Sequence, residues 1–259
     1  MKAIILSAGQ GKRLLPLTAA KPKCLLPFAG RTLLEWQLRT LAVAGVGEAV
    51  VVTGFAAADV EAELAGLHLP GLRVRTLFNP FYGVADNIGS CFLAAPEMVG
   101  DFLIVNGDTL FEPAVPAALL AQATAPVTVT IDRKDRYDAD DMKVCLDREQ
   151  DGGRRLRAIG KTLPPDSVDG ESIGLLLFRD DGGSRFAHAV QAILHEPGGT
   201  RHWYLSAIDR LARGGERVEA VSIEGRQWTE VDYPADAERA RRLVESWVAA
   251  GRFGAMAAE

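Results

Sequence analysis

The sequence predicts an α/β fold, with a Rossmann-like, mostly parallel sheet flanked by helices. Short apolar runs such as Ala3–Leu6, Ala49–Val52 and Phe102–Val105 recur along the chain, and helical patterns lie between them. Near-continuous apolar strands that alternate with helices are typical of a parallel sheet covered on both faces. With 259 residues, 48% of them hydrophobic, the chain is long enough to bury one full core. We therefore expect a single domain over residues 1–259.

The first part of this domain is expected to span residues 1–131. It contains a further strand pattern at Val74–Phe78. Leucines at helical spacing between residues 34 and 41 predict a helix that should end near Gly45. Residues 127–131 alternate apolar side chains with threonine, which is typical of a half-buried strand.

The chain changes character after residue 131. Charged turns surround the apolar run Met142–Leu146, and we expect residues 132–180 to form a small β-rich insertion. Residues 181–259 should close the domain, with a last helix whose apolar face packs back on the core. The elements expected here are helices at about 184–195 and 203–213, a strand near 218–223, a helix carrying Ala237, Ala240, Leu243, Val244 and Trp247, and a frayed end at 251–259.

Composition and charge exclude several classes of function. The net charge of −5 argues against the broad basic face with which proteins bind nucleic acid, so no nucleic acid partner is expected. The three cysteines are far apart and lack paired metal-ligand spacing, which suits reduced thiols and a cytoplasmic location. No apolar run approaches the length of a membrane span, and no signal-peptide pattern is present, so we expect no membrane association.

A glycine-rich turn follows the first predicted strand. Gly9 and Gly11 allow the backbone to turn sharply and to present bare N–H groups to an anion. This combination of glycines and nearby positive charge indicates a polyphosphate site. The cations of the segment are Lys12, Arg13, Lys21 and Lys23.

The common phosphate-loop patterns fit this turn poorly. A Walker loop is excluded because Leu6 and Arg13 occupy positions that need glycine and a hydroxyl residue. A dinucleotide fingerprint would need a third glycine where Leu14 stands. The remaining alternative is an ordinary surface loop with solvated basic side chains.

The turn is also part of a longer motif, Gly-x-Gly-x-Arg-x-x-Pro-Leu-Thr at residues 9–18, followed by Pro-Lys-x-Leu-Leu-Pro at residues 22–27. This motif resembles the signature of the nucleotidyltransferases that activate sugar phosphates and small alcohol phosphates. The resemblance covers almost the whole chain, through residues 106–108, 170–174 and 228–232, and its later motifs are most similar to the phosphocholine cytidylyltransferase branch. It implies transfer of a nucleotidyl group, a cytidylyl group in this branch, from a nucleoside triphosphate such as CTP to a small phosphate or phosphonate such as phosphocholine, with release of pyrophosphate.

Two acids far apart in the sequence form a second pattern. Asp108 and Asp232 each follow an apolar or aromatic strand. Mg²⁺ usually takes one or two carboxylates and leaves its other positions to water and phosphates, so two acids are enough for a magnesium site. In the family that the chain resembles, the matching acids hold the metal. The alternative is that each aspartate is a helix N-cap or a turn residue.

Arg13 and Lys23 are the predicted catalytic residues. A phosphate acceptor is already a nucleophile, so the enzyme has to overcome repulsion between two anions by positioning and charge neutralisation. We assign Arg13 to the β,γ-phosphates, Lys23 to the α-phosphate and the acceptor phosphate, and Mg²⁺ on the two aspartates to the α-oxygens. Lys12 and Lys21 are interpreted as loop charges.

Recognition of the base is expected to use backbone groups and asparagines. Asparagine can both donate and accept a hydrogen bond, which suits a pyrimidine edge, and the branch resemblance implies cytidine. The alternative for Asn87 is a helix cap. The predicted nucleotide-binding residues are Ala8, Gly9, Gly11, Asn79, Asn87, Gly89 and Ser90.

The acceptor pocket is predicted to combine acids with aromatic side chains, because a quaternary ammonium group is selected by cation–π contact and charge pairing. Each aromatic residue could instead fill the core. Glu171 lies in a strand-like segment, where a buried charge needs a partner unless it faces water at a sheet edge. The predicted acceptor-binding residues are Asp141, Lys143, Glu171, Ser172, Trp203, Tyr204 and Trp228.

Three alternatives stay open. The acceptor could be a sugar 1-phosphate or a polyol phosphate, with CTP, UTP, GTP or dTTP as donor. A glycosyltransferase often has Asp-x-Asp at its metal, which Asp108-Thr109-Leu110 lacks. A non-catalytic nucleotide-sugar sensor would more naturally have lost one of the charged residues. The sequence fits a monomer or a homodimer.

Overall fold

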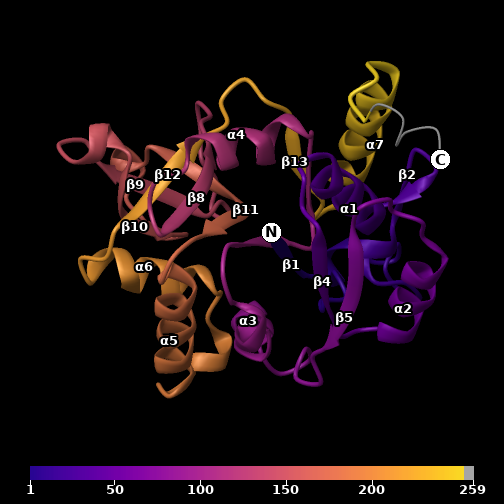
Figure 1. The fold of residues 1–259 in the computed structure, drawn as a ribbon, viewed down its shortest axis with the longest axis horizontal. Coiled ribbons are helices and arrows are strands. Elements are labelled where there is room, and N and C mark those ends of the chain that lie inside the picture. The colour runs from indigo at the N-terminus through magenta and orange to yellow at the C-terminus, as the bar shows by residue number, and fades with distance from the viewer. Residues whose placement is uncertain (254–259) are drawn as a thin grey trace. The chain divides into compact units, whose positions relative to one another are not determined.

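The structure, a computed structural model, describes residues 1–253 and shows an α/β protein with strands flanked by helices (Figure 1). Contacts along the chain divide it into two compact units. The first comprises Met1–Gly83, Val105–Ala117 and Arg226–Glu259, and the second Val84–Ile104 and Ala118–Gly225. The predicted α/β class is confirmed. The predicted insertion at 132–180 lies within the second unit, and the predicted single domain with its internal boundaries stays a prediction.

A parallel sheet forms the centre of the first unit. Its strands are β1 (Lys2–Leu6), β4 (Glu48–Thr53) and β5 (Arg73–Phe78), in the order β5-β4-β1. Ser7 N donates to Val52 O at 3.0 Å and Asn79 N donates to Thr53 O at 2.8 Å. The loops that follow β1 and β5 therefore begin at one edge of the sheet, as the sequence predicts for parallel strands.

Three helices belong to the first unit: α1 (Leu33–Val43), α2 (Ala57–Gly66) and α7 (Pro234–Ala249). The side chain of Thr32 caps α1 by accepting from Glu35 N at 3.2 Å, and α1 ends just before Gly45, which has a φ of +84°. Two short antiparallel pairs complete the unit, β2 (Pro27–Phe28) with β3 (Arg31–Thr32) and β7 (Thr109–Phe111) with β13 (Trp228–Glu230).

The last helix packs as its sequence pattern predicts. Ala240, Val244 and Trp247 of α7 are buried in one cluster with Trp36 and Phe28, and Ala237 and Leu243 pack against that cluster. The apolar face of α7 is thereby confirmed. The predicted fraying concerns residues 251–259, of which 254–259 lie outside the described residues.

The second unit has a different kind of sheet. Its strand order is β6-β11-β8-β12-β10-β9. Only β8 and β12 pair in parallel among the recorded pairs of this unit, and the others are antiparallel. The sheet of the protein is therefore mixed, since it contains both parallel and antiparallel strand pairs. The strands are β6 (Phe102–Asn106, whose last two residues belong to the first unit), β8 (Val127–Asp132), β9 (Lys143–Asp147), β10 (Arg155–Gly160), β11 (Gly170–Phe178) and β12 (Val218–Ser222).

The prediction of a half-buried strand at residues 127–131 was wrong. Thr128 and Thr130 are as fully buried as Val127 and Val129. Strand β8 lies between β11 and β12, and both of its faces are covered. Threonine is tolerated there because β-branched side chains pack well on a pleated surface.

Two helices of the second unit occur where the sequence predicts them, α5 (Gly182–Leu194) and α6 (Leu205–Arg213). The unit also contains α3 (Asn87–Leu93) and most of α4 (Ala114–Gln122), which begins in the first unit. The ring of Phe178 stacks on Phe102 with centroids 4.8 Å apart and packs on Phe186 at 5.0 Å. These aromatic contacts join the sheet to α5.

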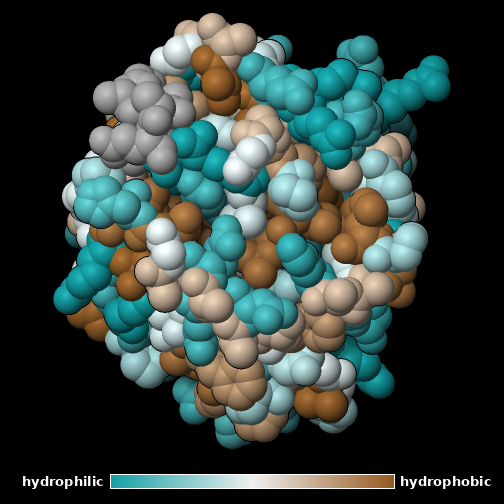
Figure 2. All heavy atoms as spheres, turned by 90° about the vertical axis from the view of Figure 1, so that its right-hand side faces the viewer, coloured by the Kyte–Doolittle hydropathy of each residue, from teal (hydrophilic) through white to brown (hydrophobic). Residues whose placement is uncertain are grey.

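The surface seen in Figure 2 mixes hydrophilic and hydrophobic side chains, as is normal for a folded domain. Among the described residues, no helix is long and apolar enough to cross a membrane.

Candidate active site

The glycine-rich turn makes room for a lysine. Gly11 has a φ of +79°, and a Cβ atom added to it would lie 2.8 Å from Cβ of Lys23. The hydroxyl of Thr18 donates to Gly11 O at 2.8 Å and holds the turn closed. Gly11 is therefore needed twice, for its left-handed backbone and for the close approach of Lys23.

Lys23 joins the two predicted metal ligands. Its Nζ lies 2.9 Å from Asp108 Oδ2 and 2.6 Å from Asp232 Oδ1. Arg13 Nη2 lies 2.6 Å from the other oxygen of Asp232, and its guanidinium lies 5.1 Å from the ring centroid of Tyr233. We call Arg13, Lys23, Asp108 and Asp232 the Lys23 cluster. All four residues belong to the first unit, so the fold brings together charges that are far apart in the sequence.

The turn that carries Asp108 is fixed from two sides. Nε2 of the buried Gln37, on α1, donates to Asn106 O at 2.7 Å and to Thr109 O at 2.8 Å. Gly107 N donates to Leu6 O at 3.1 Å, and a Cβ on Gly107 would lie 2.4 Å from that oxygen. Asp108 is thereby held against the end of β1.

Asp232 is fixed by the start of α7. The carboxylate of Asp236 accepts from Asp232 N at 3.1 Å and from Tyr233 N at 2.8 Å, as an acid in the first turn of a helix does. One residue earlier, Val231 N donates to Asp108 O at 3.0 Å. This bond joins the two acidic segments directly.

The ammonium group of Lys23 is stabilised by its partners. Burial lowers its pKa, but the charges and hydrogen bonds of Asp108 and Asp232 outweigh burial and hold the pKa above its ordinary value of 10.5. Lys23 is therefore fully charged at neutral pH. A fixed positive charge is what a site for transferring phosphoryl groups needs.

The two aspartates fit the requirements of Mg²⁺. Their carboxylates converge on one cation, the Lys23 ammonium, and each keeps part of its surface exposed. Among residues 1–253 there is no group of three or more His, Cys, Asp and Glu side chains that could hold a metal. A pair of hard oxygen ligands suits Mg²⁺, which takes its remaining ligands from water and phosphates.

The predicted nucleotide-binding residues fall into two groups. Ala8, Gly9 and Asn79 lie after β1 and β5, where Ala8 O accepts from Phe55 N at 3.0 Å; Gly11 lies beside Lys23. The others, Asn87, Gly89 and Ser90, are the first residues of α3 in the second unit. The alternative of Asn87 as a helix cap is wrong, because Asp86 is the N-cap and Oδ1 of Asn87 accepts from Tyr204 N at 2.8 Å.

A second lysine-centred group lies in the second unit. Lys134 Nζ lies 2.8 Å from Asp141 Oδ2 and 2.8 Å from Glu171 Oε2, and 5.8 Å from the ring centroid of Tyr137. We call Lys134, Tyr137, Asp141 and Glu171 the Lys134 cluster. The structure thus brings together Asp141 and Glu171, two of the predicted acceptor-binding residues.

Charge interactions in the Lys134 cluster are strong. Burial raises the pKa of Glu171 to about 7, against the opposing effect of Lys134. Burial also acts on Lys134 and Asp141, but hydrogen bonds and ion pairs outweigh it, so the pKa of Lys134 is raised and that of Asp141 is lowered. Glu171 is therefore the group of this cluster that changes charge near neutral pH.

Two further predicted acceptor residues lie beside this cluster. Lys143 pairs with Glu171 between β9 and β11, and its buried ammonium donates to backbone oxygens of Asp138 and, at 3.0 Å, Lys161. Lys143 therefore holds the loop that carries Asp141. Ser172 N donates to Met142 O at 2.8 Å and so fastens the other end of that loop.

The three predicted aromatic residues have different surroundings. Trp203 is partly exposed, with Lys161 Nζ 4.4 Å from its ring centroid. Tyr204 is fully buried and packs edge to face on Phe186, with ring centroids 6.2 Å apart. These surroundings agree with the alternative that this aromatic residue fills the core. Trp228 is partly buried on β13, in the first unit. Their role in acceptor binding stays a prediction.

Sequence reasoning missed two residues of the Lys134 cluster and two residues that contact other predicted site residues. Lys134 and Tyr137 lie in a charged turn where nothing in the spacing distinguishes them from solvated residues. Tyr233 could have been found from its neighbour, since it directly follows the predicted metal ligand Asp232, whereas no local signal marks Lys161.

Comparisons with known proteins agree with this geometry. Residues 3–218 match the sequence model of the MobA-like NTP transferase domain. The chain is similar to the CMP-5'-(3-aminopropyl)phosphonate synthase of Streptomyces rubellomurinus, with 32% identity over 93% of this chain and 38% of that protein. It is also 32% identical to the bifunctional IPC transferase and DIPP synthase of Rubrobacter xylanophilus, over 97% of this chain and 54% of that protein. The chain thus spans about half, or less, of the length of these relatives.

A solved structure shows the same fold. The CTP:phosphocholine cytidylyltransferase of Streptococcus pneumoniae superposes with a TM-score of 0.73 at 20% identity, over 94% of this chain and 98% of that chain.

Proposed function

Because the chain belongs to the family of MobA-like NTP transferase domains, we propose that it transfers a nucleotidyl group from a nucleoside triphosphate to a small phosphorylated acceptor and releases pyrophosphate. The observation that carries this proposal is the Lys23 cluster. A largely buried, charged lysine, an arginine and two converging carboxylates meet beside a glycine-rich turn. These are the charges needed to bring two phosphate anions together.

Each residue of the cluster has a proposed role. Arg13, nearly half exposed, binds the β,γ-phosphates that leave as pyrophosphate. Lys23 neutralises the α-phosphate and the acceptor phosphate as they approach. Asp108 and Asp232 would hold Mg²⁺, which supplies further positive charge beside the α-oxygens when it is bound. No side chain is needed as a general base, because the acceptor phosphate is already an anion.

The nucleotide is proposed to be CTP. Two similarities support a cytidylyl group: the similar Streptomyces protein is named for a CMP product, and the structurally similar Streptococcus protein for CTP. The backbone of Ala8 and Gly9, with the asparagines Asn79 and Asn87, supplies donors and acceptors for a pyrimidine edge.

The acceptor is proposed to be a small phosphate or phosphonate that carries a cationic group, such as phosphocholine or an aminoalkyl phosphonate. The Lys134 cluster supports a cation, because its two carboxylates already hold an ammonium group. A sugar 1-phosphate or polyol phosphate is the second candidate, since hydroxyl groups also bind to carboxylates.

A pyrophosphate-release screen tests this proposal. The four nucleoside triphosphates are combined with a panel of small phosphates and phosphonates in the presence of Mg²⁺. Release is expected with CTP and a cationic acceptor, and it should depend on both. If no pair gives pyrophosphate, the protein is not a nucleotidyltransferase for small acceptors and the sensor alternative gains support.

A further inference from the structure

The Lys134 cluster has the form of an ammonium site that the protein fills with its own side chain. Two carboxylate oxygens lie 2.8 Å from the same nitrogen, and the Tyr137 ring lies beside it. Distances of this size are direct, charge-assisted N–H···O bonds. The site is thus built around an atom that carries hydrogens and positive charge.

Lys134 is the easiest member of this site to remove. Its side chain is 36% exposed, whereas those of Asp141 and Glu171 are 12% and 8% exposed. It belongs to residues 133–142, which form neither helix nor strand, while Glu171 is part of the buried strand β11. An incoming ammonium group would take over both contacts of the Lys134 ammonium, so the exchange would leave neither buried acid without a partner. The two carboxylates would remain in place.

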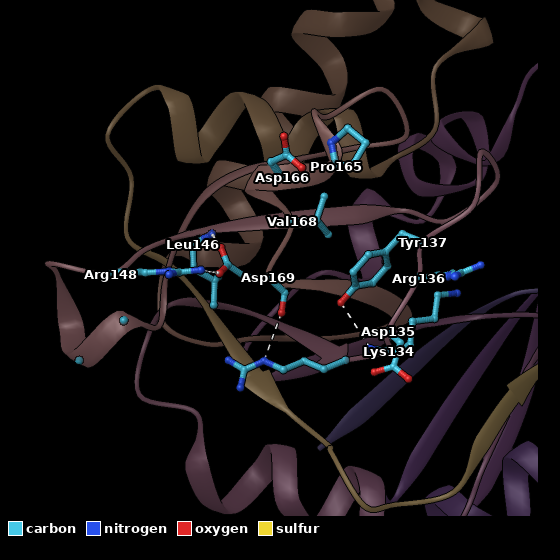
Figure 3. A pocket seen from close by; sticks show the side chains of 13 residues that line it. Lys134, Asp135, Arg136, Tyr137, Leu146, Arg148, Pro165, Asp166, Val168 and Asp169 are labelled. Atoms are coloured by element: carbon cyan, nitrogen blue, oxygen red, sulfur yellow. Dashed lines mark hydrogen bonds and ion pairs between the residues drawn. The ribbon is translucent and has the colours of Figure 1, made fainter.

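A cavity next to this site offers room for a ligand. It measures about 970 Å³ and is lined by three loops, with Lys134 and Tyr137 on its wall (Figure 3). Tyr137 is fixed there, since its hydroxyl accepts from Lys134 N at 3.4 Å. The cavity can therefore accommodate a displaced Lys134 side chain, which already lies on its wall.

The distances also select the type of ammonium. A primary ammonium has three N–H donors and can approach two carboxylate oxygens at 2.8 Å, as Lys134 does. A quaternary ammonium has none, and its methyl groups keep the oxygens beyond hydrogen-bond distance. Such a group is normally held by several aromatic faces, but the cluster supplies only the Tyr137 ring, at 5.8 Å from the nitrogen.

We infer that the acceptor carries a primary ammonium group, which replaces Lys134 between Asp141 and Glu171. This inference rests on the proposed function and narrows its acceptor class from cationic phosphates in general to primary aminoalkyl phosphates and phosphonates. Lys134 then acts as an internal competitor, which keeps the two carboxylates paired until an acceptor arrives.

Binding calorimetry with matched acceptors tests the inference without any turnover. The probes are O-phosphoethanolamine, phosphocholine and ethyl phosphate, with 3-aminopropylphosphonate and propylphosphonate as a longer pair, each titrated with and without a non-reacting CTP analogue and Mg²⁺. Two charge-assisted hydrogen bonds should make the primary ammonium ligands bind at least about tenfold tighter than ligands that lack an ammonium or carry a quaternary one. Equal binding of phosphocholine and O-phosphoethanolamine would overturn the inference, as would the absence of binding by both aminoalkyl ligands.

Variants distinguish an ammonium-binding site in the Lys134 cluster from an ion pair with a purely structural role. Glu171→Gln and Asp141→Asn should each remove most of the preference for O-phosphoethanolamine over ethyl phosphate, measured as the ratio of the two affinities within the same variant. Lys134→Met should tighten the binding of the primary ammonium severalfold, because the competitor is gone; a purely structural role predicts weaker or unchanged binding. Arg157→Met, which removes an exposed cation of the same unit outside the cavity lining, is the matched control. Circular dichroism confirms that each variant is folded.

Failure of the inference and failure of the proposed function give different results. Tight, ammonium-dependent binding without pyrophosphate release would contradict the proposed reaction and still support an ammonium site in the Lys134 cluster. Pyrophosphate release only with acceptors that lack a primary ammonium would contradict the ammonium site and still support the proposed reaction.

Discussion

The protein contains two lysines that each join a pair of carboxylates, and they differ in which partner is buried. In the Lys23 cluster the lysine is the most buried member, 14% exposed beside aspartates at 25% and 16%. In the Lys134 cluster the order is reversed, with the lysine 36% exposed above carboxylates at 12% and 8%. The first arrangement holds the ammonium group at least as deeply as the carboxylates, of which Asp108 is the more accessible. The second buries the two acids more deeply than the lysine, as the proposed replacement of Lys134 requires.

This difference suggests a division of chemistry. A fixed cation with accessible carboxylates suits phosphates and a metal ion, whereas a fixed pair of carboxylates suits a cationic ligand. A lysine with two carboxylates can therefore serve an anionic or a cationic ligand, depending on whether the fold buries the lysine or the carboxylates more deeply. The following predictions test this contrast, from the largest expected effect to the smallest.

Removing either carboxylate of the Lys23 cluster should abolish Mg²⁺-dependent product formation. Asp108→Asn and Asp232→Asn each leave one charged oxygen ligand for a metal that takes few protein ligands. The measurement is pyrophosphate release against Mg²⁺ concentration, with Asp59→Asn on the exposed face of α2 as control. A wild-type response to Mg²⁺ in either variant would show that this aspartate is structural.

Loss of the fixed charge should lower the turnover number strongly. Lys23→Ala is expected to reduce kcat by a factor on the order of a hundred or more, the effect of losing one preorganised charge stabiliser. Lys12→Ala, on the exposed side of the same turn, should change kcat little. Near-normal turnover of folded Lys23→Ala would contradict the role of Lys23 at the reacting phosphates. The difference between the two lysine clusters would then have no consequence for catalysis.

The turn that presents Asp108 should matter for metal binding even though its support touches no ligand. Gln37→Met removes both hydrogen bonds that bracket Asp108 and should raise the Mg²⁺ concentration for half-maximal activity about tenfold, as is typical when support of a metal ligand is lost. The exposed Gln122→Met is the control. A general loss of stability with an unchanged Mg²⁺ requirement would restrict Gln37 to a structural role.

The sequence predicted the frame of the molecule better than its charge clusters. The strands at residues 3–6, 49–52 and 74–78 were predicted from local runs of apolar residues, and each of these runs lies in a strand of the structure. Asp108 and Asp232 were found because each follows a strand and the resemblance marks them. Lys134 was missed because its importance depends on Glu171, a residue of strand β11 that lies far from the Lys134 loop in the sequence.

The burial of β8 was misjudged for a similar reason. Alternation with threonine is a local pattern, but burial depends on what covers the strand, which only the fold determines. Local spacing therefore predicts which residues share a face of a strand. Long-range packing determines whether that face is buried and which residues contact it.

The smallest effect concerns stability as a function of pH and involves Glu171. Its pKa is raised from 4.5 to about 7 in the folded protein, so the folded state holds a proton that the unfolded chain releases. Stability should therefore decrease as the pH rises from about 4.5 to about 7. Asp141, with a lowered pKa, and Lys134, with a raised one, titrate outside this window.

Glu171→Gln should remove this decrease, because glutamine cannot titrate. Thermal unfolding of both proteins between pH 4.5 and 7.5 should show curves that diverge with rising pH, by about 1–3 kcal/mol after allowance for the partly exposed Lys134, or a few degrees in Tm. Parallel curves would mean that Glu171 is already ionised at pH 4.5. The fixed negative charge would then be better stabilised than its burial implies, and the Lys134 ion pair would be harder to displace than the contrast between the two clusters requires.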